Sequence, residues 1–515
     1  MTDLVDLLPG SLLVLAPLAI SLVTAVAVFL IPEGGVRSRS TVNLGAAAVK
    51  LGLIALMVPV VVGGARPEWR TALLPGIDFV LRIEPLSLLF AGLSSLLWLL
   101  TTVYAIGYLE DRPHRSRFFG FFALCVTATV GIAFSGNLVT FLLFYELLTL
   151  VTYPLVVHNG TAAARRSGRL YMLYTLGGGL SLLTGIVWLS ALVGDVEFTP
   201  GGVEAVGALA ADSPATAVAI FALMVAGLGV KAALFPLHGW LPRAMVAPAP
   251  VSALLHAVAV VKAGVFGLVR VIDDVYGVEV ASALGVLTPL LVLASFTVLY
   301  GSVRALFQDD LKKRLAYSTV SQVSYITLGI TLVTAVGTAG GLAHLVHQGL
   351  MKITLFFCAG LFAEVLGIKT VSALAGLGRR MPWTCAAFTV GAFGMIGVPP
   401  VAGFISKWEL GLGALDSENQ WVVWVLVASA VLNSAYFLPP VVAMWFRRAE
   451  ESRGESHQDS PEVPDYRRRR GLEAPAALLV PAVITAGLSL AVGIVAAAPY
   501  APLAMATFIA RGVFP

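Results

Sequence analysis

Five lysines stand inside long apolar runs of this 515-residue chain, where a charged side chain needs a special reason. They are Lys50, Lys231, Lys262, Lys352 and Lys407. A charged group at the centre of a membrane helix costs roughly 2.5–3.5 kcal/mol on insertion scales. Lysine can release its proton when it is removed from water, whereas arginine effectively cannot. Only eight of the 33 basic residues are lysines, and five of these eight lie in apolar segments. This distribution is typical of a proton path.

Three glutamates occur in the same kind of segment and could exchange protons with such lysines. Glu146 lies within the apolar run FLLFYELLTL. Glu364 and Glu409 are close to the ends of their runs, so an interfacial position explains them equally well. Lys50 is also open to two interpretations, because it could extend to the membrane surface or face another subunit. The residues expected to transfer protons directly are therefore Glu146, Lys231, Lys262 and Lys407.

Four histidines fall in or at the ends of the apolar runs, namely His238, His256, His344 and His347. An imidazole titrates near neutral pH and could relay protons, but a neutral histidine can also be a hydrogen-bonded packing residue. We expect His256, His344 and His347, together with Lys352, to be possible relays. His238 is a further candidate.

No metal site or redox cofactor is expected on this chain. His344 and His347 are three residues apart and share a helix face, but no third ligand of a suitable type is nearby. Cys125, Cys358 and Cys385 are far apart and show no CxxC spacing. We therefore expect no cofactor.

The composition requires that these residues be held by membrane helices. Hydrophobic residues make up 58% of the chain and charged residues 12%, and the mean hydropathy is +0.90. Soluble domains carry about a quarter charged residues, so a soluble enzyme or nucleic-acid-binding protein is excluded. We predict an all-α membrane protein with about fourteen spans, each near 20 residues: 11–31, 42–63, 85–108, 117–135, 137–158, 169–193, 215–242, 247–271, 281–305, 315–336, 339–366, 383–412, 421–446 and 474–497.

The basic residues of the connections predict the orientation. Odd-numbered connections hold 23 of the 33 lysines and arginines, whereas even-numbered ones hold five, counting Arg270 and Arg511. Lysine and arginine accumulate in cytoplasmic loops, so residues 447–473 are predicted to be a cytoplasmic basic loop. Both termini are then outside a cell (inner) membrane. The acidic N-terminus lacks the features of a cleaved signal, and we expect the first apolar run to be retained.

Two of the predicted helices contain breaks. The seventh reads KAALFPLHGWLP from Lys231, and the twelfth reads GVPPVAGFISK up to Lys407. Proline breaks within a membrane require protein or water to satisfy the freed carbonyls. Paired broken helices in opposite orientation are typical of inverted repeats. We predict one membrane domain over 1–515, with repeats at 117–271 (helices four to eight) and 281–446 (helices nine to thirteen), and with a C-terminal helix and tail at 474–515.

Four segments carry a resemblance to a known family: KAALFPLHGWLPRAMVAPAPVSALLHAVAVVKAG (231–264), QDDLKKRLAYSTVSQVSYI (308–326), HLVHQGLMKITLFFCAG (344–360) and GMIGVPPVAGFISKW (394–408). They resemble the proton-translocating antiporter-like subunits of respiratory complex I, energy-converting hydrogenases and Mrp-type sodium/proton antiporters. The similarity runs over roughly 80–446. It implies multi-pass partner subunits in a hetero-oligomeric complex.

The resemblance also implies roles for individual residues. Glu146 on the fifth helix would pair with Lys231 on the seventh, Lys262 would be the central lysine, and Lys407 would be the ionisable residue of the broken twelfth helix. Tyr145 stands where many members have tryptophan. Lys407, with Lys352, makes the chain more similar to the D-type subunit of the Mrp antiporters than to the complex I M-type subunit, which usually has glutamate there. The chain ends soon after the fourteenth span, unlike the complex I L-type subunit and the Mrp A-type subunit.

The resemblance thus implies a subunit that exchanges protons for a monovalent cation, with sodium expected. One alternative is the proton-pumping arm of a complex I-like oxidoreductase or energy-converting hydrogenase, and another is a carrier such as a CO2-uptake partner. In each case the other partners are membrane subunits and the lipid bilayer, and no nucleic acid is expected.

Overall fold

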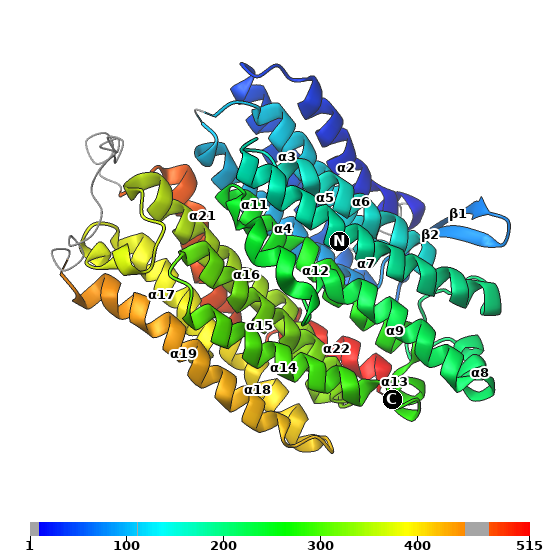
Figure 1. Cartoon of the computed structure of the whole chain (residues 1–515). Coiled ribbons are helices and arrows are strands. Elements are labelled where there is room, and N and C mark those ends of the chain that lie inside the picture. Colours follow the sequence, from blue (N-terminus) through cyan, green and yellow to red (C-terminus); the bar gives the residue numbers. More distant parts are fainter. Residues whose placement is uncertain (1–9, 111, 449–472, 515) are drawn as a thin grey trace.

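The computed structural model describes residues 10–110, 112–448 and 473–514. Within these ranges the chain is a bundle of long helices that lie side by side, with one short β-hairpin at an end of the bundle (Figure 1). The basic loop expected at 447–473 falls almost entirely outside the described residues. The predicted all-helical membrane architecture is confirmed apart from the hairpin.

The first third of the chain forms six long helices and the hairpin. The helices are α2 (Gly10–Leu30), α3 (Val36–Val62), α4 (Pro85–Tyr108), α5 (Arg115–Phe134), α6 (Leu138–Val156) and α7 (Ala162–Val193). The hairpin joins β1 (Glu68–Leu74) to the antiparallel β2 (Ile77–Arg82) between α3 and α4.

The middle of the chain is more irregular. It consists of α8 (Glu204–Asp212), α9 (Pro214–Lys231), η1 (Leu237–Gly239), α10 (Trp240–Arg243), η2 (Ala244–Val246), α11 (Ala249–Ala253), η3 (Leu254–Val258), α12 (Val260–Val269), η4 (Arg270–Tyr276) and α13 (Val278–Ala283). The segments η3 and η4 are π-helical, so 249–276 is one helical stretch with two wider turns.

The last part returns to long helices. They are α14 (Leu287–Leu306), α15 (Leu311–Thr331), α16 (Ala335–Leu366), α17 (Pro382–Ile396), α18 (Ala402–Asp416), α19 (Val422–Phe446), α21 (Ala476–Ile494) and α22 (Pro502–Val513), with short η5 (Ser372–Leu374) and η6 (Leu377–Arg379) between α16 and α17.

Polar residues fix where several helices begin. The side chains of Asn137, Thr161, Asp310 and Thr334 accept hydrogen bonds from backbone N–H groups three residues later, at 2.8–3.1 Å. These caps satisfy donors that an apolar sequence would leave unpaired. They set the first turns of α6, α7, α15 and α16.

Each expected span overlaps one or more helical elements. Among the described residues, twelve helical stretches are long and apolar enough to cross a membrane. The two expected spans outside that set are 315–336, whose helix α15 is rich in polar residues, and 383–412, which is divided into α17 and α18. The two inverted repeats stay a prediction.

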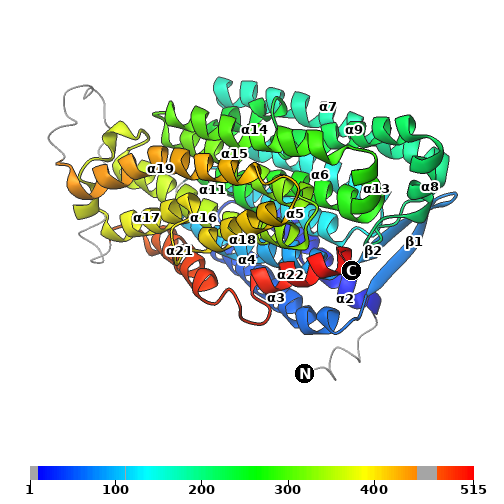
Figure 2. The same cartoon turned by 90° about the horizontal axis from the view of Figure 1, so that it is seen from below.

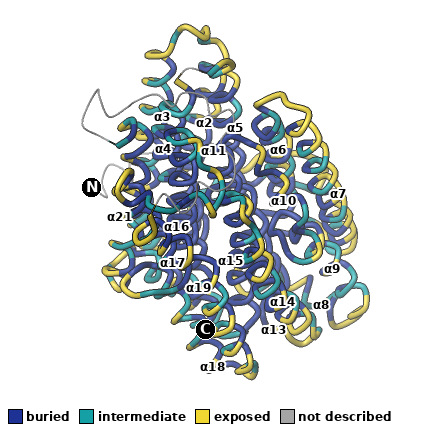
Figure 3. The backbone as a smooth tube through the Cα atoms, turned by 60° about the vertical axis from the view of Figure 1, so that its left-hand side comes forward, coloured by how far each residue is buried: buried dark blue, intermediate teal, exposed yellow. Residues whose placement is uncertain are grey.

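Burial is highest at the centre of the bundle. Helix α12 is completely buried and α16 is buried along nearly its whole length. Figure 3 shows the buried backbone, in dark blue, at the centre of the bundle. Outer helices such as α7 expose large apolar side chains, including Leu173, Leu180 and Val187. The polar side chains thus lie on the central helices, and apolar side chains cover the outside of the bundle. This arrangement is expected when ionisable groups act within the membrane.

Described odd-numbered connections between predicted spans lie at one end of the bundle, and described even-numbered ones lie at the other. Arg112, Lys312 and Lys369, from the third, ninth and eleventh connections, line one cavity of about 340 Å³. The hairpin, the 195–200 segment and the end of η4, from even-numbered connections, meet at the other end, where α22 also lies (Figure 2). The alternation of faces is therefore as expected for these connections, and which face is cytoplasmic stays a prediction.

Candidate functional site

The first helix break lies directly after Lys231, the last residue of α9. Ala233 adopts a left-handed conformation with φ 56°, and Pro236 has no N–H to continue the helix. The Val230 carbonyl freed by the break accepts a hydrogen bond of 2.7 Å from Trp240 Nε1. Protein groups therefore satisfy the break, as a membrane interior requires.

The second break is satisfied by a lysine. Helix α17 ends at Ile396 because Gly397 has φ 98°, a region open to glycine. Lys407, on α18, donates from Nζ to the carbonyls of Met395 at 2.6 Å and Ile396 at 3.1 Å. A cation at a helix C-terminus is stabilised by the aligned carbonyls. The predicted position of Lys407 at the twelfth-helix break is thus seen directly.

The expected partners Glu146 and Lys231 are neighbours that make no direct ion pair. Lys231 is fully buried, donates to the Tyr145 carbonyl, and has its Nζ 3.3 Å from the centre of the Tyr145 ring. Glu146 is half-buried, its Oε1 accepts no hydrogen bond, and Lys231 is the charged group that acts on it electrostatically. Lys231 is therefore hydrogen-bonded to the backbone of Tyr145, the residue before Glu146, and not to the Glu146 carboxylate.

Helix α7 makes room for this carboxylate at a glycine. A Cβ on Gly179 would clash with Glu146 Oε1, whereas a Cβ on Gly177 would meet nothing within 4 Å. We expect Gly179→Ala to displace the Glu146 side chain and to slow proton flux about tenfold or more, with normal assembly. Gly177→Ala should behave as wild type. Proton flux in vesicles and the yield of the purified complex would check this, and equal flux in the two variants would contradict it.

A glycine also brings the central lysine close to the first break. A Cβ on Gly264 of α12 would clash with the Ala232 backbone nitrogen, so α12 and the end of α9 touch through their backbones. Lys262, two residues earlier, is fully buried and donates from Nζ to the Leu345 carbonyl on α16 at 2.6 Å. The structure therefore places Lys262 between the α9 break and α16.

A second polar group joins α15, α16 and α18. His344 lies between Ser406 Oγ, 2.8 Å from Nδ1, and Gln322 Oε1, 3.1 Å from Nε2. Ser406 precedes Lys407 in the chain. Lys352, also on α16, donates to Ser318 Oγ at 2.6 Å. His344 thus contacts the residue that precedes Lys407, and both His344 and Lys352 contact neutral oxygens.

The other histidines are positioned differently. His256 and His347 are both fully buried; His347 lies beside the Ala402 backbone, whereas neither ring nitrogen of His256 has a hydrogen-bond partner among the described residues. Such groups are costly in a dry apolar core and are usually hydrated. His238 lies in η1, nearly buried, with its ring 5.0 Å from that of Tyr300. It is also 6.4 Å from the ring of Tyr317 on α15, so His238 packs against aromatic rings and is not hydrogen-bonded to His344 or Lys407.

Lys50 and Glu364 have partners within the chain. Lys50 is fully buried, donates to Ser21 Oγ at 2.8 Å, and lies 5.4 Å from the Trp98 ring. Extension to the surface and exposure to another subunit are both wrong for it, because helices α2, α4 and α5 pack against that face of α3. Glu364 pairs with Arg112 at 2.6 Å at the end of α16. Glu409 is half-buried on α18.

A buried ion cluster near the hairpin is not predicted by the sequence, and the assignment of Arg270 to a connection is wrong. Arg270 is 2% exposed within the 249–276 stretch and pairs with Glu84 at 2.7 Å and Asp274 at 2.6 Å. Its charge is tolerated inside the stretch because both carboxylates neutralise it. The sequence signal that could have found it is the i,i+4 spacing of Arg270 and Asp274.

The hairpin extends this cluster to the surface. Arg82 pairs with Glu68 at 2.7 Å and with Glu197 at 2.5 Å. Burial alone would lower the pKa of Arg82, but the hydrogen bonds and charges of these carboxylates raise it. The hairpin is thus tied to the 195–200 segment through its arginines.

The fold and the buried residues define the class of protein. It is a multi-pass helical bundle with lysines and histidines at two helix breaks. The family model described as "NADH:quinone oxidoreductase/Mrp antiporter, TM" matches residues 135–433, and that of "NADH-Ubiquinone oxidoreductase (complex I), chain 5 N-terminus" matches 74–119. Since the first match covers more than half of the chain, this protein belongs to the family of antiporter-like membrane subunits shared by complex I and the Mrp antiporters.

Individual relatives come from both branches. The N-type subunit of the NADH-quinone oxidoreductase of Desulforudis audaxviator is 34% identical over 430 residues, 82% of each chain. The D-type subunit of the Na(+)/H(+) antiporter of Alkalihalophilus pseudofirmus is 26% identical, over 66% of this chain and 68% of its own. A chain of the Mrp complex from a Dietzia species superposes with a TM-score of 0.81 at 25% identity, covering 98% of this chain and 97% of its own. The similarity to the antiporter relative is real but does not exceed that to the oxidoreductase relative.

Proposed function

We propose that this chain conducts protons within a multisubunit antiporter that exchanges H+ for a monovalent cation, sodium in the first instance. The observation that carries the proposal is the set of interior lysine ammonium groups held by neutral oxygens. Lys262 and Lys352 are fully buried, and Lys407 is partly buried, yet the described residues provide none of them with an ion pair. A purely structural lysine would be expected to have a carboxylate partner.

Glu146 and Lys231 would act as the switch. At about 4 Å and an effective dielectric of 20, their charges would attract by roughly 4 kcal/mol, which would hold both groups ionised. Lys231 donates to the Tyr145 carbonyl, and in this proposal that contact corresponds to the open arrangement of the pair. When the pair is open, the charged lysine has lost its counter-ion, and its proton can pass towards Lys262, whose helix touches the end of α9. His344, with Lys352 and Lys407, would continue the path.

Partners are part of the proposal. One solved relative is a chain of an Mrp complex, and we infer that this chain also works beside other membrane subunits. Lys50 and Glu364 give no support to this inference, because both residues are satisfied within the chain. The inference rests on the family.

A second candidate function is the proton-pumping arm of a redox complex, which the 34% identity to a complex I subunit favours. Purification of the native complex and identification of its partners separates the two functions. Small multi-pass subunits without redox centres support the antiporter. Copurifying flavin or iron–sulfur proteins would replace it by the redox arm.

A further inference from the structure

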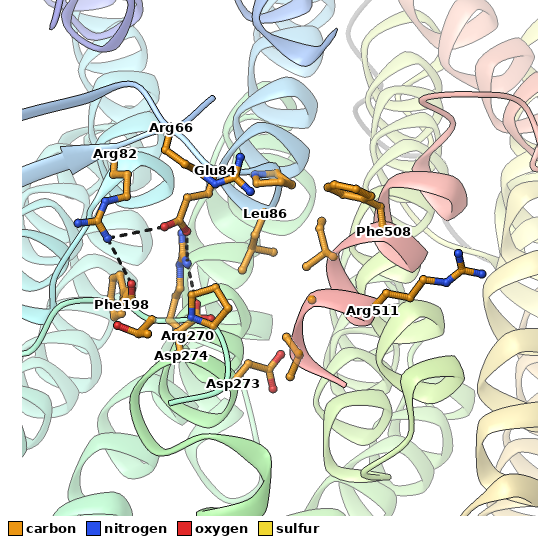
Figure 4. Close-up of a pocket in the computed structure, with 16 residues that line it drawn as sticks. Arg66, Arg82, Glu84, Leu86, Phe198, Arg270, Asp273, Asp274, Phe508 and Arg511 are labelled. Atoms are coloured by element: carbon orange, nitrogen blue, oxygen red, sulfur yellow. Dashed lines mark hydrogen bonds and ion pairs between the residues drawn. The ribbon is translucent and has the colours of Figure 1, made fainter. Parts of the chain in front are cut away.

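A cavity of about 750 Å³ opens at the hairpin end of the bundle, between the start of α4, η4 and α22 (Figure 4). Its charged lining comes from four different parts of the chain. These residues are Glu84, Arg82, Arg270, Asp273, Asp274 and Arg511, with Arg66 at the rim. A cavity of this size with charged groups in its wall has room for many water molecules.

Most charges around the cavity are already neutralised. Arg270 is shared by Glu84 and Asp274. Arg82 is shared by Glu68, Glu197 and, at 3.9 Å, Glu84. Arg66 donates to the backbone carbonyls of Val61 and Ala65. The Arg82 and Arg270 guanidinium groups are therefore already paired with carboxylates, and Arg66 is directed to backbone carbonyls at the exposed rim.

Asp273 is the exception. The residue is only 2% exposed, and neither carboxylate oxygen has a hydrogen-bond partner among the described residues. In Figure 4 it lies on the cavity wall facing α22, with no interaction drawn to it. Arg511, exposed on α22, makes no ion pair with it. An ionised carboxylate here would have no hydrogen-bond donor and no ion pair of its own among the described residues, since the nearby Arg270 is paired with Glu84 and Asp274, and this is a costly arrangement.

The position of Asp273 along its helix connects it to the interior. Asp273 follows Lys262 by eleven residues within the continuous stretch 249–276, so the two are roughly 16 Å apart along the axis at about 1.5 Å per residue. Lys262 is at the centre of the bundle, and Asp273 is at the cavity. One helical stretch thus carries an interior proton-transfer candidate and an unpartnered carboxylate at the mouth.

We propose that Asp273 is a proton-exchange group of this mouth, where protons pass between the water-accessible cavity and the interior path. The exchange forms one O–H bond on a carboxylate oxygen and breaks it again, with the proton taken from or given to water and no electron transferred. The charged groups that face it are Arg270 and Asp274 on its own helix, Glu84 at the start of α4, Arg66 and Arg82 beside the hairpin, and Arg511 on α22. The proposal deepens the proposed function and rests on it.

Infrared difference spectroscopy of the purified whole complex, stepped between two pH values, tests the protonation directly. Wild type should show a carbonyl stretch of a protonated carboxyl group that shifts in D2O. This band should be lost in Asp273→Asn and be retained in Asp212→Asn, which removes an exposed carboxylate at the end of α8. Asp273→Glu should move the band instead of removing it.

Proton flux in liposomes is measured on the same samples. Asp273→Asn should reduce flux about tenfold or more, and Asp273→Glu should restore much of it. An identical band in wild type, Asp273→Asn and Asp273→Glu would overturn the proposal, as would unchanged flux in Asp273→Asn. Absence of flux in wild type would instead refute the proposed function, because the infrared band does not depend on transport.

Discussion

Lys231→Arg is expected to reduce proton flux to background while the complex still assembles. Arginine preserves the positive charge and can donate to the Tyr145 carbonyl as Lys231 does, so the local structure should persist. Arginine cannot release a proton in the accessible pH range. A loss of about tenfold or more corresponds to at least about 1.4 kcal/mol in the barrier. Flux in proteoliposomes and the yield of intact complex are the two readouts.

The Glu146→Gln variant completes this experiment. It removes the carboxylate that would hold Lys231 in its charged form and should also impair flux. Because both residues act in one switch, the double variant with Lys231→Ala should be little worse than either single variant, a non-additivity of roughly 0.5–3 kcal/mol. Normal flux in a well-expressed Lys231→Arg variant would make the pair structural and end its assignment as a switch.

Arg270→Ala is expected to have the largest effect on stability. The variant leaves Glu84 and Asp274 buried without their shared counter-ion, and breaking such a pair from one side costs about 3–5 kcal/mol. The matched control is Arg165→Ala, which removes an exposed arginine at the start of α7 and should be neutral. Thermal unfolding of the purified complex in detergent would measure both.

A triple variant separates charge from packing at this cluster. Combining Arg270→Met with Glu84→Gln and Asp274→Asn removes all three charges and should recover much of the loss, because no uncompensated ion then remains. Equal destabilisation by Arg270→Met alone and by the triple variant would show that packing, not charge, explains the effect.

Hydrophobic runs and proline breaks are sufficient to predict the long helices, because each long span buries apolar surface in lipid or against a neighbour, but not the short helices α8 and α22. Lys407 can be placed correctly since the carbonyls freed after Ile396 need a donor, and α18 provides one. The hairpin at Glu68–Arg82 cannot be predicted in this way, because it is held by ion pairs with a segment more than a hundred residues away.

The site is less predictable where backbone contacts decide it. Gly179 and Gly264 read as ordinary packing residues in the sequence, yet one accommodates Glu146 and the other brings α12 to the α9 break. Whether Lys231 contacts Glu146 or the Tyr145 carbonyl depends on side-chain rotamers that no spacing fixes. The sequence does not single out Asp273, because only the structure shows that Arg270 pairs with Asp274 and that Asp273 has no ion pair.

The most direct test is cation-linked proton exchange by the purified native complex in sealed liposomes, compared with the same complex carrying Lys262→Ala. We predict that addition of NaCl changes the internal pH of wild-type liposomes, whereas Lys262→Ala liposomes, with the complex fully assembled, respond like protein-free ones. Lys262 is the residue that contacts α16 and lies beside the first break. Exchange at the wild-type rate in Lys262→Ala would contradict a proton path through this chain.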